Sequence, residues 1–128
     1  MVSKPKLSDY VSRVPVTAST DQTVAFARLL MVEHKIRHLP VLRGDAVVGV
    51  FSQRDMLLLD AITDGGEVSL EKAMVGDPYV VDINDDLATV ANEMAARRLG
   101  SAVVVDAGEV VAMFTTVDAL RALAAALS

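Results

Sequence analysis

A hydroxyl residue followed three positions later by an aspartate occurs twice in this 128-residue chain. The segments are FSQRDML, residues 51–57, and FTTVDAL, residues 114–120. An ionised carboxylate accepts two hydrogen bonds, which suits the adjacent hydroxyls of a sugar, and such charge-assisted bonds are roughly twice as strong as neutral ones. The pairs Ser52 with Asp55 and Thr115 with Asp118 are therefore candidates for binding a diol.

The same spacing is also that of a helix capping box, in which the hydroxyl and the acid satisfy backbone N–H groups at a helix start. Both pairs stand where a helix is expected to begin. In that role each pair contributes about 0.5–2 kcal/mol of stability and binds nothing. The spacing alone leaves both interpretations open.

Basic residues gather just before the first of these pairs. The segment EHKIRHLP, residues 33–40, brings four potentially cationic groups together in a chain of net charge −5. Arginine can grip a phosphate with two hydrogen bonds. This segment is therefore a candidate for contacting a phosphate, and Arg54 is a further cation nearby. The alternative is a solvated loop whose cations stabilise the end of the preceding helix.

Composition excludes several classes of protein. Hydrophobic residues make up 52% of the chain and aromatic residues 4%, so the core must be aliphatic. The net negative charge argues against nucleic acid as a partner. The absence of cysteine removes disulfides and thiolate sites. No apolar run approaches the ~20 residues of a membrane span, so we expect no membrane association and a cytoplasmic protein.

A metal site and an enzyme are both poorly supported. His34 and His38 have helical spacing, but Pro40 follows closely and the His-Glu-x-x-His arrangement is missing. The chain has no Gly-x-Ser-x-Gly motif and no glycine-rich phosphate loop. We expect no metal, no catalytic residues and no catalytic cofactor.

The chain is an internal repeat with an offset of 63 residues. This offset pairs Pro15 with Pro78 and Met31 with Met94 without any gap, and it also superposes the two hydroxyl–aspartate pairs. Each copy is expected to contain a short lead-in helix followed by a β-α-β-β-α unit. Asp21 and Asn84 are the expected caps of the first long helices. The expected paired strands are HLPVLR with AVVGVF, and SAVVVD with EVVAMF.

These residues resemble a known family. The run IRHLPVLRGDAVVGVFSQRDML, residues 36–57, is similar to the signature of the cystathionine-β-synthase (CBS) domain. The second copy resembles a degenerate version, with Val103 in place of the proline and Ala112 in place of the glycine. The resemblance implies an α+β fold with two CBS repeats, residues 1–64 and 65–128. Together they would form one Bateman module, packed sheet to sheet with pseudo-twofold symmetry.

The resemblance also implies a function. Modules of this family bind AMP, ADP, ATP or S-adenosylmethionine in the cleft between repeats, where the motif aspartate holds the ribose. It implies a homodimer in the form of a four-domain disc that acts on a partner protein, whose identity the sequence does not give. A ligand-free module for oligomerisation or protein interaction is the alternative. The expected ligand-binding residues are Thr17, Arg37, His38, Ser52, Arg54, Asp55, Val80, Ser101, Thr115 and Asp118.

The two sites are not expected to be equivalent. Gly100 and Ser101 stand at the positions that match Arg37 and His38, so the second copy lacks charge there. Thr17 and Val80 match family positions beside the adenine ring. Asp55 is therefore expected to matter more for an adenosine ligand than Asp118.

Overall fold

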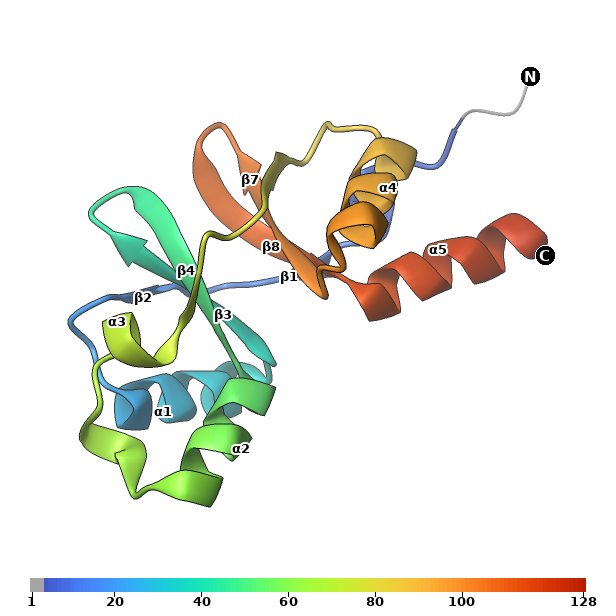
Figure 1. Cartoon of the computed structure of the whole chain (residues 1–128). Helices are drawn as coiled ribbons and strands as arrows, with labels where there is room; N and C mark the ends of the chain where they lie inside the picture. The colour runs from blue at the N-terminus through green and yellow to red at the C-terminus, as the bar shows by residue number, and fades with distance from the viewer. Residues whose placement is uncertain (1–3) are drawn as a thin grey trace. The chain divides into compact units, whose positions relative to one another are not determined.

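The computed structural model describes residues 4–128 and is a mixed α+β fold with two four-stranded sheets, which confirms the expected fold class (Figure 1). The 63-residue repeat extends to the backbone. The helices α1 (Val24–His34) and α4 (Leu87–Arg97) begin and end at matching positions, and both end in a left-handed residue, Lys35 with φ 54° and Arg98 with φ 55°.

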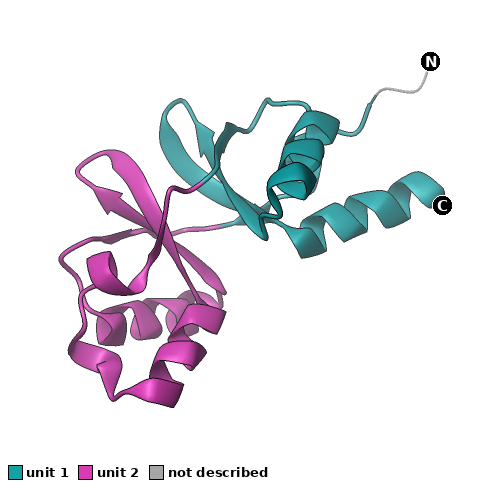
Figure 2. Ribbon diagram, in the orientation of Figure 1, with its two compact units in different colours: residues 1–13, 79–128 teal, residues 14–78 magenta. Residues whose placement is uncertain are grey.

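The chain forms two compact units, which Figure 2 colours separately. The first-repeat unit is Val14–Pro78, in magenta, and the second-repeat unit is residues 4–13 together with Tyr79–Ser128, in teal. Each unit contains one sheet and its own hydrophobic core.

The sheet of the first-repeat unit has the strand order β2-β3-β4-β5. Its strands are β2 (Ala18–Ser19), β3 (His38–Arg43), β4 (Ala46–Ser52) and β5 (Val75–Gly76). The β2–β3 pair is parallel and the other two pairs are antiparallel. The helices α1, α2 (Gln53–Ile62) and α3 (Leu70–Ala73) contribute Val24, Met56 and Leu70 to the core beside Phe51.

The sheet of the second-repeat unit has the order β1-β8-β7-β6, with the same pattern of parallel and antiparallel pairs. Its strands are β1 (Ser12–Arg13), β6 (Val80–Asp82), β7 (Ser101–Asp106) and β8 (Glu109–Thr115). The helices α4 and α5 (Thr116–Leu127) and the short 3-10 helix η1 (Leu7–Asp9) place Leu87, Ala122 and Leu7 in a core with Phe114.

The first segments of the two repeats are exchanged between the units. The strand β1 lies near the start of the first repeat but pairs with β8 of the second. The strand β5 lies near the start of the second repeat but pairs with β4 of the first. The sequence division at residues 64 and 65 therefore describes the repeats and not the compact units, because each lead-in strand extends the other repeat's sheet.

A glycine allows one of these exchanged strands to approach. A Cβ atom on Gly49 of β4 would lie 2.9 Å from the carbonyl oxygen of Val75 and closer still to Sδ of Met74. Real Cβ contacts of this length do not occur, so β5 pairs with β4 only if residue 49 has no side chain.

The helix caps differ from those expected. The caps of α1 and α4 are Thr23 and Asp86, not Asp21 and Asn84. The preceding polar residues form turns instead, with Gln22 N–H donating to the Ser19 carbonyl at 3.1 Å. Each observed cap therefore lies two residues after the expected one.

Candidate functional site

Both hydroxyl–aspartate pairs are capping boxes at the starts of α2 and α5. In the first, Ser52 N–H donates to Asp55 Oδ2 at 2.8 Å, and Asp55 N–H donates to Ser52 Oγ at 3.1 Å. In the second, Thr115 N–H donates to Asp118 Oδ2 at 2.9 Å, and Asp118 N–H donates to Thr115 Oγ1 at 3.3 Å. Both pairs therefore cap helices, and any binding role is additional to the cap.

The carboxylate of Asp118 is almost completely covered, with 2% of the residue exposed. The hydroxyl of Ser12, from β1, lies 3.0 Å from Asp118 Oδ1 and 3.1 Å from Oδ2. Thr115 Oγ1 donates to Oδ2 at 3.0 Å, and the Arg121 guanidinium lies 3.9 Å from Oδ1. Hydrogen-bond donors of the protein thus meet both oxygens of this carboxylate.

The surroundings of Asp55 differ, and Asp55 is only half-buried. The position that matches Ser12 is occupied by Val75 of β5, whose side chain cannot donate a hydrogen bond. Val75 pairs with Val50, and Ser12 pairs with Met113, so the two residues have the same register on matching strands. The Asp55 carboxylate therefore lacks the serine hydroxyl that covers Asp118.

The fold brings three of the predicted residues of the first repeat together. His38, the first residue of β3, is directly opposite Ser52, the last residue of β4. Gln53 N–H donates to the Arg37 carbonyl at 2.8 Å, which holds Arg37 beside the start of α2. Arg37 and Arg54 are exposed, and within residues 4–128 neither takes part in an ion pair. This end of the sheet thus carries two arginines available to an anion.

Arg37 also lines a separate hollow of about 290 Å³ in the first-repeat unit. Its other lining residues include Lys35, Gln53 and Met56, whereas Ser52 and Asp55 do not line it. The arginine and the aspartate are close in the fold without sharing this hollow.

The second repeat has no such basic group at the matching positions. Ser101 is opposite Thr115, but Gly100 and Val117 replace the two arginines. The nearby Arg97 lies over the ring of Tyr79, 5.2 Å from its centroid, so it is used elsewhere. Burial raises the pKa of Tyr79, Glu93 and Asp85 raise it further, and Arg97 acts in the opposite direction.

The two residues predicted beside an adenine ring are exposed. Thr17 precedes β2, and Val80 begins β6 with 41% of its surface exposed. They belong to different units, and their role in binding stays a prediction.

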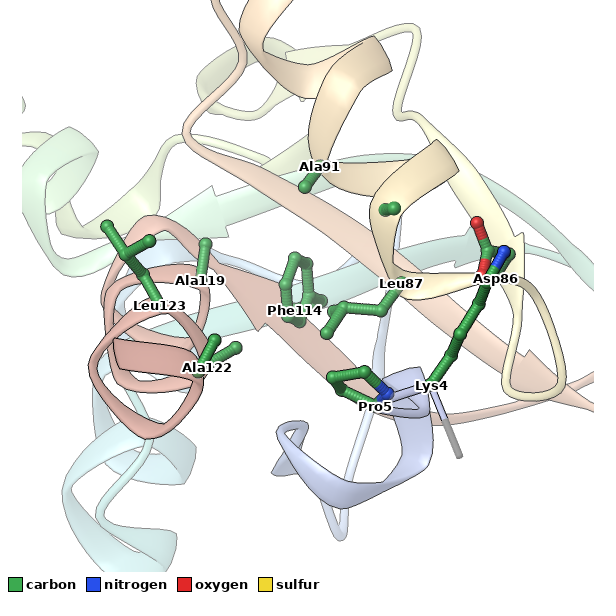
Figure 3. A pocket seen from close by; sticks show the side chains of 11 residues that line it. Lys4, Pro5, Asp86, Leu87, Ala91, Phe114, Ala119, Ala122 and Leu123 are labelled. Atoms are coloured by element: carbon green, nitrogen blue, oxygen red, sulfur yellow. The ribbon is translucent and has the colours of Figure 1, made fainter. Parts of the chain in front are cut away.

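A further pocket, which the sequence did not suggest, lies in the second-repeat unit and has a volume of about 310 Å³ (Figure 3). Ala119, Ala122 and Leu123 of α5 form one side, Ala91 of α4 another, and Phe114 lies between them. Its lining is mostly alanine and other apolar side chains, with one charged end.

That charged end is formed by Lys4 and Asp86 (Figure 3). Hydrogen bonds from Thr89 lower the pKa of Asp86, and the charge of Lys4 acts in the same direction. A repeat alignment could have found the pocket, because residues 119 and 122 are alanines where the first repeat has Met56 and Leu59.

The described part of the chain shows neither a cluster of metal-ligating side chains nor a membrane-spanning helix. Residues 4–128 contain no group of three or more His, Cys, Asp or Glu side chains arranged to hold a metal ion. None of the helices in the same range has the length and apolar character needed to cross a membrane.

Known proteins are similar to this chain along most of its length. A curated relative, the inosine-5′-monophosphate dehydrogenase of Korarchaeum cryptofilum, is 28% identical over 114 residues, which are 88% of this chain but 23% of that protein. The chain therefore spans about a quarter of the length of this relative.

Two solved structures share the fold. CBSX2 in complex with AMP is 23% identical, with a TM-score of 0.75, over 96% of this chain and 99% of that one. A CBS domain pair in complex with 5′-methylthioadenosine and S-adenosyl-L-methionine is 22% identical, with a TM-score of 0.78, over 97% and 99%. The family model of the CBS domain matches residues 7–61 and 67–125. The chain thus belongs to the CBS domain family and contains two copies of the domain.

Proposed function

We propose that this protein is a regulatory module that binds an adenosine-containing ligand and transmits its occupancy to a partner protein. The ligand is AMP, ADP, ATP or S-adenosylmethionine, and the module has no catalytic activity of its own. Asp55 accepts hydrogen bonds from the ribose hydroxyls, and Ser52 supports it at the start of α2. Thr17, Val80 and Ser101 remain predicted contacts, and Thr115 and Asp118 remain predicted contacts only of a second ligand.

The observation that carries this proposal is the asymmetry between the two carboxylates. Asp118 is buried and Ser12 donates to it. Asp55 is half-buried, and Val75 stands at the position that matches Ser12. A ligand diol replaces water on an accessible carboxylate more easily than it replaces a protein hydroxyl. Asp55 is therefore the better ribose contact.

The charges near Asp55 favour a ligand that also carries phosphate. Arg37 and Arg54 are exposed and form no ion pair within the described residues, and His38 lies opposite Ser52. An arginine–phosphate contact is geometrically specific because two N–H groups can donate in parallel. We therefore expect AMP, ADP or ATP to bind more tightly than adenosine.

The similar structures support this ligand class, because CBSX2 was solved with AMP and another CBS pair with two adenosine compounds that carry sulfur. The affinity of this chain for such compounds follows from its own residues. Its two arginines favour phosphate over the uncharged sulfur group of 5′-methylthioadenosine.

The alternative is a ligand-free interaction module, which exposed apolar side chains on two helices favour. On α2 these are Leu57, Leu58 and Ile62, and on α5 they are Val117, Leu120, Leu123 and Leu127. Such surfaces are typical of protein contacts. In either case we expect a homodimer, and a monomer mass by light scattering would contradict it.

Titration calorimetry with AMP, ADP, ATP, adenosine and S-adenosylmethionine tests the ligand half of the proposal. A ligand present at 100 times its dissociation constant adds about 2.7 kcal/mol of stability, so the melting temperature provides a second reading. The diagnostic variant is Asp55→Ala, and its matched control is Asp64→Ala, since Asp64 is exposed and makes no side-chain capping bond.

We expect Asp55→Ala to remove most of the binding and Asp64→Ala to leave it intact. If all five compounds fail at millimolar concentration, the interaction module replaces the proposal. If Asp55→Ala binds as tightly as the natural chain, the carboxylate assignment is wrong.

A further inference from the structure

The Ser12 hydroxyl contacts the Asp118 carboxylate in the way that a hydroxyl of a ligand diol would. A vicinal diol binds a carboxylate by presenting hydroxyls to both of its oxygens. Ser12 Oγ lies 3.0 Å from one oxygen of Asp118 and 3.1 Å from the other, so a single hydroxyl already covers that edge. The residue that makes this contact comes from β1, near the start of the first repeat.

Three features indicate that Ser12 covers the Asp118 carboxylate without being needed to hold it in place. It is exposed, although Asp118 beneath it is only 2% exposed. It lies in a two-residue strand at the edge of its sheet. Asp118 keeps its bonds from the Thr115 hydroxyl and backbone N–H when Ser12 is removed.

The first repeat provides an internal control for this contact. Val75 occupies the matching position, with the same register on β4 that Ser12 has on β8. Val75 is 60% exposed, and nothing in its side chain can donate to Asp55. One side chain thus distinguishes the covered carboxylate from the uncovered one.

We propose that Ser12 closes the second carboxylate to ligands, so that each chain binds one adenosine-type ligand, through Asp55. This inference rests on the proposed function and adds that residues 12 and 75 decide which repeat binds. A serine on the exchanged lead-in strand closes the site of the repeat that it joins, and an apolar residue there leaves the site open.

Two reciprocal substitutions test the inference by calorimetry, with adenosine and AMP as probes. Val75→Ser places a hydroxyl over Asp55 and should weaken adenosine and AMP about tenfold or more, the size of one charge-assisted hydrogen bond. Ser12→Ala uncovers Asp118 and should add a second equivalent of adenosine. Adenosine is the better probe there because Gly100 and Val117 leave the second repeat without a phosphate contact.

Gly76→Ser is the matched control for Val75→Ser. Successive residues of a strand point to opposite faces, so this hydroxyl would point away from Asp55. A Cβ atom on Gly76 has its nearest neighbour at 3.9 Å, and the residue therefore has space for a side chain. We expect this variant to bind as the natural chain does, and melting temperatures confirm that all three variants fold.

The outcomes separate this inference from the proposed function. If the natural chain binds two equivalents, or if it binds one and neither Val75→Ser nor Ser12→Ala changes the binding, the role of Ser12 is refuted while ligand binding stands. If neither the natural chain nor Ser12→Ala binds any probe, the proposed function fails and this inference fails with it. The expected result is that the natural chain binds one equivalent of adenosine, that Ser12→Ala binds two, and that Val75→Ser binds more weakly. This result supports both the proposed function and the role of Ser12.

Discussion

The two units of this protein share a backbone and differ in what their side chains enclose. The strands β3 and β7, the helices α1 and α4, and even the bulges after Val41 and Val104 match at an offset of 63 residues. The differences concern a carboxylate and a crevice between two helices. They show that a duplicated fold can keep its geometry while its possible binding sites diverge.

At the positions that line the pocket of Figure 3, the crevice between the helices is filled in the first-repeat unit and open in the second. In the first-repeat unit Met56 is buried, Leu59 packs on the same core, and Arg28 on α1 forms a salt bridge of 2.8 Å with Asp60 on α2. In the second-repeat unit Ala119 and Ala122 stand at the positions of Met56 and Leu59. Ala91 and Leu123 stand at the positions of the ion pair. The pocket of Figure 3 lies there.

The largest effect is expected from opening the filled crevice with Met56→Ala. Removing a buried methionine side chain costs about 2–5 kcal/mol, because the cavity collapses only in part. Met56 has 7% of its surface exposed, so we expect a loss within that range in urea denaturation. Leu57→Ala is the control, since Leu57 is 61% exposed and should cost far less. Equal losses in the two variants would show that Met56 does not fill the crevice.

A somewhat smaller effect should separate the two carboxylates in stability. Asp118→Asn replaces a buried acceptor that Ser12, Thr115 and a backbone N–H all contact. Bonds to charged groups are worth about 1.5–3 kcal/mol, and we expect a loss of that order. Asp55 is half-buried and serves mainly as a helix cap, so Asp55→Asn should lower the free energy of unfolding by about 1 kcal/mol. The reverse order in urea denaturation would contradict the difference in their surroundings.

Much of this fold follows from the sequence, because its signals are local. Both strand hairpins were predicted to within one residue at their ends, since apolar runs flank turns in which Gly44, Ala107 and Gly108 have positive φ. The repeat itself fixed the order of elements in both units. Helix starts were less accurate, because Asp21 and Asn84 also suit the turns that precede α1 and α4.

The features that sequence reasoning missed depend on contacts between distant segments. Ser12 and Asp118 are 106 positions apart, and only the pairing of β1 with β8 brings them together. Nothing near Ser12 in the sequence marks it as a partner for a carboxylate. The open crevice likewise arises from alanines on separate helices, each of which looks ordinary in its own segment.

A gain of stability is expected when the open crevice is filled. Ala119→Met copies Met56 into the second-repeat unit, where Ala119 lines the pocket. Filling a cavity at a compatible site commonly adds about 0.5–2 kcal/mol. We expect a higher midpoint of urea denaturation with an unchanged slope. Ala124→Met is the control, because Ala124 is an exposed residue of α5 that does not line the pocket. A loss in Ala119→Met alone would mean that the pocket cannot accept the larger side chain.

The smallest expected effect is a difference in pH dependence between the cap of α1 and the cap of α4. Thr23 accepts from Phe26 N–H and does not ionise, whereas Asp86 accepts from the backbone and hydroxyl of Thr89. These bonds hold the pKa of Asp86 below its ordinary value of 3.8. Its stabilising contribution is therefore complete above that value and lost as the pH falls through the lower pKa of the folded state.

Amide chemical shifts measured from pH 5 to strongly acid solution should consequently show a titration at Thr89 and none of that origin at Phe26. The variant Thr89→Val removes the hydroxyl donor but keeps the backbone one, so the midpoint should move toward 3.8 without reaching it. An unchanged midpoint would show that the hydroxyl does not hold the carboxylate. A titration at Phe26 with the same midpoint would show that acid affects the whole fold and not only the Asp86 cap.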